Sequence, residues 1–183
     1  VKNITNLASK EILDIEADAY INGKVRFKAH VGFNYSKSQF NFEGKIDAFN
    51  LPDLNLLIQA YTPAKINKGV ADEITFSGVA GDKSAAGTMR FLYHNLEVDL
   101  ELQNLAKWKS SVITFAANTA LLDSNPMEGE TVPREVKFKI QRDMNKGFVN
   151  VIIKSVLNGL KETMIMNKEN RKAHKEAKKK AEE

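Results

Sequence analysis

The chain has 183 residues, of which 43% are hydrophobic and 27% are charged, a composition typical of one ordinary globular domain. It contains no cysteine, which excludes disulfides and thiolate metal sites. The formal net charge is +4, but seven Lys or Arg and four Glu lie in residues 167–183, so the remaining chain is nearly neutral. A nucleic-acid-binding protein would show basic residues clustered over a folded face, and we therefore expect no nucleic-acid partner.

The chain begins Val1-Lys2-Asn3, without an initiator methionine or a signal peptide. We therefore expect a mature form or a segment of something longer. No apolar run in the sequence reaches the ~18 residues that a membrane-spanning helix needs.

Three strands are predicted first, over residues 13–21, 25–35 and 40–48. Apolar residues occupy the odd positions of the first two segments and the even positions of the third. Such alternation is typical of an antiparallel sheet with one apolar and one polar face.

The turns between these strands predict a register. A three-residue loop over residues 21–23 pairs Ala17 with Phe27, and the next turn pairs Phe33 with Phe42. Both pairings keep the apolar side chains on one face, whereas a slip by one residue would turn a whole strand over.

Residues 51–62 change to a helical period. Leu54, Leu57, Ile58 and Tyr61 are spaced i, i+3, i+4 and i+7, which predicts about two helical turns. Asn50 is positioned to cap this helix, and a proline follows it at position 63.

Strands resume at Val70 and continue to residue 102. Pairing Phe76 with Met89, and Ile74 with Phe91, keeps one face apolar. After residues 94–95 the apolar phase shifts by one position, which predicts a β-bulge.

The second half of the chain is mostly helical by pattern. Amphipathic helices are predicted over residues 104–122 and 146–166, with one alternating strand over residues 136–140 between them. The sequence therefore predicts an α+β fold: an antiparallel, twisted β-meander sheet whose apolar face is partly covered by about three amphipathic helices. Residues 1–166 form the domain, and residues 167–183 form a basic, helical C-terminal tail.

The residues that carry chemistry do not form a catalytic or metal-binding pattern. The three histidines, at positions 30, 94 and 174, share no spacing that would bring two of them to one metal. Asp72, Glu73 and Asp143 adjoin turns and strand ends, where carboxylates are ordinarily solvated. The sequence contains no phosphate-binding glycine loop and no nucleophile elbow. We therefore expect a protein that is not an enzyme and needs no metal or cofactor.

A ladder of aromatic side chains falls on the predicted apolar face. In one interpretation the helices cover this face and the aromatics are ordinary core. In the other, part of the face stays open as a groove for acyl chains, because apolar pockets bind apolar ligands with few polar requirements. The candidate groove residues are Phe27, Phe33, Tyr35, Phe40, Phe42, Phe76, Phe91 and Tyr93.

The basic tail also has two interpretations. It is a solvating end segment, or it contacts an anionic membrane surface, where each basic residue contributes on the order of 1 kcal/mol. The candidate contact residues are Lys168, Arg171, Lys172, Lys175, Lys178, Lys179 and Lys180.

Four segments of the chain resemble the C-terminal part of AsmA-like proteins of the Bacteroidetes type. They are residues 42–55 (FEGKIDAFNLPDLN), residues 66–99 (INKGVADEITFSGVAGDKSAAGTMRFLYHNLEVD), residues 118–126 (NTALLDSNP) and residues 142–163 (RDMNKGFVNVIIKSVLNGLKET). The resemblance covers roughly residues 25–166 and rests on general pattern, without a catalytic signature.

The resemblance implies a bacterial envelope protein. AsmA-like proteins are anchored in the inner membrane by an N-terminal helix, extend into the periplasm, and are associated with phospholipid movement and outer-membrane integrity. From it we expect a non-catalytic module on the periplasmic side that handles lipid or helps to maintain the outer membrane, anchored through a part missing from this chain. Its expected partners are phospholipid, an anionic membrane surface and envelope proteins. The alternative is a protein–protein interaction or scaffolding domain with a fully covered sheet.

Overall fold

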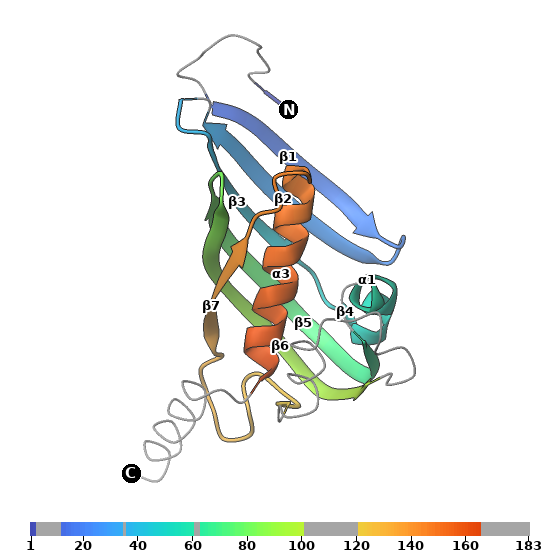
Figure 1. Cartoon of the computed structure of the whole chain (residues 1–183). Helices are drawn as coiled ribbons and strands as arrows, with labels where there is room; N and C mark the ends of the chain where they lie inside the picture. The colour runs from blue at the N-terminus through green and yellow to red at the C-terminus, as the bar shows by residue number, and fades with distance from the viewer. Residues whose placement is uncertain (3–11, 35, 61–62, 101–120, 166–183) are drawn as a thin grey trace, which may run out of the picture.

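The computed structural model describes residues 1–2, 12–34, 36–60, 63–100 and 121–165. The fold is α+β, with a seven-stranded antiparallel open sheet whose main path follows the order β1-β2-β3-β5-β6-β7 (Figure 1). These strands span Ile12–Ile21 (β1), Val25–Asn34 (β2), Gln39–Ile46 (β3), Ala64–Ala80 (β5), Ser84–Leu100 (β6) and Glu135–Gln141 (β7). The short strand β4 (Phe49–Asn50) pairs with β5, off the main path.

The β1–β2 hairpin forms where it is predicted, but its register differs. Ala17 lies opposite Ala29 rather than opposite Phe27. The loop begins at Asn22 instead of one residue earlier, because Asn22 and Gly23 both adopt left-handed backbone conformations, with φ of 52° and 70°. Asparagine and glycine are the residues that tolerate such conformations best in a hairpin turn.

The β2–β3 pairing differs from the prediction by the same amount. Phe33 lies opposite Phe40 rather than opposite Phe42. Both differences are shifts by two residues, so every side chain stays on the face that the alternation predicts.

The segment after β4 is less helical than predicted. A 3₁₀ turn (η1, Leu51–Leu54) leads into a helix of five residues (α1, Asn55–Gln59), and no side chain caps either one. The chain then enters β5 at Ala64, six residues before the predicted start. Asn55 ties the helix to this strand, because its side chain donates to the Ile66 carbonyl at 2.8 Å and accepts from the Ile66 amide at 2.9 Å.

The long strands β5 and β6 pair as the sequence predicts over the halves that adjoin their connecting loop. Phe76 lies opposite Met89, and Ile74 opposite Phe91. The predicted irregularity after His94 is also present: the pairing steps three residues along β6 for two along β5, and Asn95 has a φ of 55°. Two further shifts occur on the β5 side of this pair.

The strand and helix predicted in the last third of the described chain are confirmed as β7 and α3 (Phe148–Met164). α3 crosses the sheet and lies chiefly against β6 and β7 (Figure 1). A Cβ atom at Gly159 would lie 2.7 Å from the Met89 sulfur, so the missing side chain lets the helix approach β6 closely. The predicted helix over residues 104–122 lies outside the described residues, except for its last two positions. At one of these two positions, the Leu122 amide donates to the Met164 carbonyl.

Aromatic rings and a buried polar residue complete the core. Phe42 packs against Phe76 and Phe138 at ring distances of 6.4 and 6.2 Å. Asn125, only 1% exposed, fixes the loop before β7 to β6. Its amide nitrogen donates to the Phe91 carbonyl, and its side-chain oxygen accepts from the Arg134 amide at 2.8 Å. Buried polar groups with full partners of this kind hold one arrangement of a loop.

Candidate functional site

The eight candidate groove aromatics divide by burial. Phe27 and Phe33, both on β2, are half-buried, and Tyr35 lies outside the described residues. The other five are core residues with at most 7% of their surface exposed: Phe40, Phe42, Phe76, Phe91 and Tyr93. A ligand that contacts this face from solvent would therefore meet the β1–β2 hairpin first.

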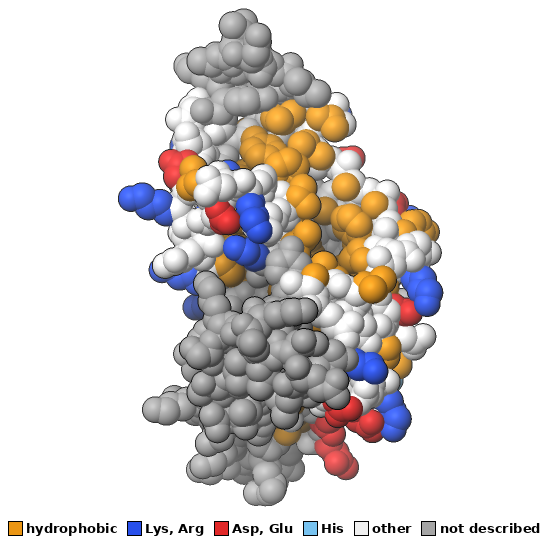
Figure 2. All heavy atoms as spheres, turned by 45° about the vertical axis from the view of Figure 1, so that its right-hand side comes forward, with side chains coloured by type: hydrophobic (Ala, Val, Ile, Leu, Met, Phe, Trp, Pro, Cys, Tyr) orange, Lys and Arg blue, Asp and Glu red, His pale blue; other side chains and the backbone are white. Residues whose placement is uncertain are grey.

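Four half-buried apolar side chains on the α3 side of β1 and β2 pack against the core while remaining partly exposed. We call these four the hairpin strip: Ile15, Ile21, Phe27 and Phe33. Figure 2 shows hydrophobic side chains gathered over the upper part of the side of the molecule where the hairpin extends beyond α3.

The width of α3 explains why this helix, among the described elements, leaves the hairpin strip partly uncovered. An α-helix with its side chains is about 10–12 Å wide, and adjacent strands lie about 4.8 Å apart, so one helix covers two or three strands. α3 lies chiefly over β6 and β7, at the opposite edge of the sheet from β1. Its N-terminal end reaches the hairpin, where Phe148 packs edge-on against Phe33 at a ring distance of 5.1 Å.

One flank of α3 adds apolar surface. The buried positions of the helix are Val151, Ser155, Gly159, Leu160 and Thr163. At 100° per residue, Val149, Ile153 and Val156 fall together on one flank, and Lys154 and Lys161 fall on the other. Val149 is 55% exposed, so the apolar flank is open to solvent at its N-terminal end.

The opposite face of the sheet is hollowed and polar. A concavity of about 820 Å³ lies across β1, β2, β3, β5, β6 and β7. Its polar lining includes His30, Glu43, Lys45, Thr75, Thr88 and Arg90. These residues occupy every second position of their strands, as the alternation that predicts a polar face requires. The curvature that brings them around one hollow comes from the twist of the assembled sheet.

Most charges in this concavity are neutralised across strands. Arg26 donates to Asp18 through two nitrogens, at 3.0 and 2.7 Å, and this pair lowers the pKa of the Asp18 carboxyl. The hydrogen bond from Lys45 lowers the pKa of Glu73 in the same way. Such exposed pairs align neighbouring strands and each contributes little stability.

His30 bridges three strands. Its Nε2 lies 3.0 Å from Asp14 Oδ1 on β1, and its Nδ1 lies 3.5 Å from Glu43 Oε1 on β3. The hydrogen bond with Asp14 raises the pKa of His30 above its ordinary value, although burial acts in the opposite direction. Only the protonated ring can donate to both carboxylates, which is why the charged form is favoured here.

The described residues offer no group of three or more His, Asp or Glu side chains that could hold a metal ion. In the same part of the chain, none of the helices has the length and hydrophobicity that crossing a membrane requires. The seven basic residues of the predicted membrane-surface contact lie outside the described residues, so that contact stays a prediction.

Comparison of the chain with protein-family models, with curated proteins and with solved structures found no significant match. The resemblance to AsmA-like proteins therefore rests on the sequence segments alone.

Proposed function

We propose that the chain is a non-catalytic lipid-handling module of the bacterial envelope, and that it binds an acyl chain along the hairpin strip. The observation that carries this proposal is the half-burial of four large apolar side chains on β1 and β2, next to Phe148 of α3, whose ring packs against Phe33. Covering such surface with a lipid tail is favourable by roughly 0.8 kcal/mol for each buried CH₂ group.

The proposal places the chain on the periplasmic side of the envelope, as part of a larger protein anchored in the inner membrane and serving outer-membrane maintenance. The resemblance to AsmA-like proteins supports this placement. The half-buried hairpin strip supports lipid handling over the scaffolding alternative, because that alternative has a fully covered sheet.

Two neighbouring positions on β1 provide a matched test. Ala19 lies opposite Phe27 and shares its face, whereas Tyr20 points to the other face and is 60% exposed. Asn at position 19 adds an amide to the strip and removes little apolar area. A ligand that buries this amide loses about 1–3 kcal/mol, so binding of a fluorescent fatty acid should weaken at least several-fold.

The Tyr20→Asn variant is the control and should bind like the parent chain. Melting temperatures of both variants establish that each is folded. Equal affinity of the Ala19→Asn variant and the parent would place the ligand elsewhere. If neither variant nor parent binds fatty acid or phospholipid, the interaction or scaffolding alternative takes precedence.

A further inference from the structure

We propose that copies of this chain associate edge to edge, with β7 of one copy pairing antiparallel to β1 of the next. The two outermost strands of the main sheet are β1 and β7, which lie on opposite sides of the molecule (Figure 1). The proposal is independent of lipid binding and concerns the backbone edges and charges of these two strands.

The edge of β1 already accepts a strand. The Lys2 amide donates to the Asp14 carbonyl at 2.8 Å, and the Asp14 amide donates to the Lys2 carbonyl at 3.2 Å. Because hydrogen-bonding direction alternates along an antiparallel strand, Glu16, Asp18 and Tyr20 direct their backbone groups to the same outer side. Among the described residues, no strand pairs with these three positions.

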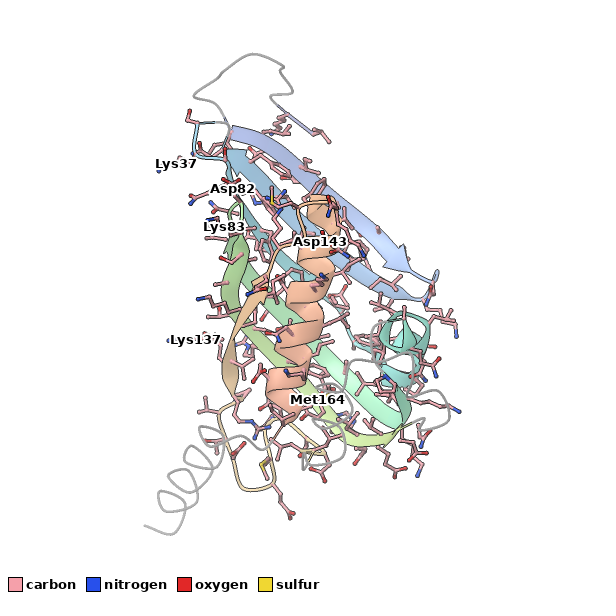
Figure 3. The ribbon with its side chains drawn as sticks, viewed as in Figure 1. Lys37, Asp82, Lys83, Lys137, Asp143 and Met164 are labelled. Carbon is pink, nitrogen blue, oxygen red and sulfur yellow. The ribbon has the colours of Figure 1, made fainter. Side chains whose placement is uncertain are left out.

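The direction of the backbone hydrogen-bonding groups along β7 follows from the same alternation. The Arg142 amide donates to the Lys83 carbonyl at 2.9 Å, in register with the β6–β7 ladder. The alternation then turns the backbone of Val136 and Phe138 toward β6, and that of Lys137 and Lys139 toward the outer edge, with which no described strand pairs. Figure 3 shows Lys137 pointing out from β7, away from the rest of the sheet.

The two edges carry opposite charges. The outward positions of β1 are acidic, at Asp14, Glu16 and Asp18, and those of β7 include Lys137 and Lys139. Within the described part of the chain, neither Lys137 nor Lys139 forms an ion pair, and Glu16 forms none either. Pairing β1 with β1, or β7 with β7, would set like charges opposite each other, which destabilises a strand pair.

One register satisfies both faces of the new pair. With Glu16 opposite Lys139 and Asp18 opposite Lys137, the charged side chains lie on the polar face. Ala17 then lies opposite Phe138, and Ala19 lies opposite Val136, on the face that carries α3. Cross-strand pairs of opposite charge and of apolar side chains are the ones that stabilise antiparallel sheets.

Strand directions permit this contact without turning the second copy over. Six antiparallel strands form the main path, so β7 runs opposite to β1. A copy displaced along the sheet therefore presents its β1 antiparallel to β7 and keeps its helix on the same face. Such a head-to-tail contact leaves a free β1 and a free β7 at the ends, so it extends into chains rather than stopping at a dimer.

Sedimentation velocity of the 183-residue chain over a concentration series, at low ionic strength, tests the proposal. The parent should show a sedimentation coefficient that rises with concentration and falls back when salt is added. Glu16→Lys and Lys139→Glu should each lower the association constant about five- to tenfold, because one attractive pair becomes repulsive. The double exchange Glu16→Lys with Lys139→Glu restores an opposite-charge pair and should return the constant to near its parent value.

Lys37→Glu is the matched control, since it makes the same change of charge in the β2–β3 turn, away from both edges (Figure 3). It should associate like the parent. Lys137→Pro tests the edge by another route, because it removes an outward amide and leaves the β6–β7 hydrogen bonds in place. It should abolish the association while the melting temperature stays close to that of the parent.

Mixing the two single variants tests the head-to-tail arrangement. Glu16→Lys keeps the parent β7 edge, and Lys139→Glu keeps the parent β1 edge. The equimolar mixture therefore offers the parent pair of charges at one contact and the exchanged pair at the next, so it should associate more strongly than either variant alone. A parent chain that is monomeric at every concentration would overturn the proposal. Occupation of the β1 edge by another segment would also give a monomer and would overturn it equally. Association of Lys139→Glu alone with parent affinity would replace it with a β1–β1 contact.

Discussion

The sheet under α3 and the β1–β2 hairpin carry the same alternation of apolar and polar residues but differ in what covers them. On β6, Met89 and Phe91 are each 1% exposed, whereas Phe27 and Phe33 on β2 are half-buried. Alternation specifies which face of a strand a side chain occupies. The position of a single helix then decides whether that face becomes core or stays within reach of a ligand.

The largest expected effect separates these two regions by stability. Phe91→Ala should cost about 3–5 kcal/mol in the free energy of unfolding, because it opens a cavity in a closed part of the core. Phe27→Ala should cost half of that or less, since part of its ring surface is in water already. Urea denaturation of both variants measures the difference, and equal losses would mean that the hairpin strip is core.

Removal of the buried amide should have the next largest effect. Asn125→Ala leaves the Phe91 carbonyl and the Arg134 amide without their partners, and we expect a loss of about 2–3 kcal/mol. Ser124→Ala, next to it in the same loop and with its hydroxyl in an exposed bond to Asp123, is the control. Similar losses for both variants would show that the loop is not fixed through Asn125.

A smaller effect concerns the polar side of the hairpin. His30 has a raised pKa in the folded chain, so the stability from its protonated form is present below the pKa of the unfolded chain and is lost as pH rises through the folded value. The unfolding free energy should therefore fall as the pH rises above about 6.5, by no more than about 1 kcal/mol, because the pairs with Asp14 and Glu43 are solvent-exposed. Thermal melts of a His30→Gln variant should show a flatter profile, and an unchanged profile would assign the pH dependence to another group.

The smallest effect on stability is expected at the C-terminus. Truncation after Met166 should shift the melting temperature very little, because the only nonpolar residues beyond it are Ala173, Ala177 and Ala181. Binding to anionic vesicles should fall on truncation and with rising salt. Equal vesicle binding by both chains would remove the membrane-surface role of the tail, and a large loss of thermal stability would show that the tail packs on the domain.

The strand pairings that were predicted correctly follow from the alternation of apolar and polar residues, which is a pattern of short period. Phe76 opposite Met89 follows from alternation on two long strands joined by a short loop. The same period explains the errors at Ala17 and Phe33, because a shift by two residues keeps every side chain on its face and alternation cannot detect it. The backbone of Asn22 and Gly23 decides that register locally.

Other features depend on parts of the chain that are distant in sequence. The short α1 follows from the early start of β5 and from the bonds between Asn55 and Ile66, which no local pattern announces. The burial of Phe40 and Phe91 depends on where α3 lies, and so the sequence could nominate the groove aromatics without separating core from surface. The polar concavity likewise depends on the twist of six assembled strands.

Native mass spectrometry of gently purified protein measures the central claim most directly. If the hairpin strip binds acyl chains, the parent should carry bound phospholipid, and the Ala19→Asn variant should lose it while the Tyr20→Asn variant retains it. Detection of the parent chain without bound lipid, or equal lipid occupancy in all three chains, would contradict the account.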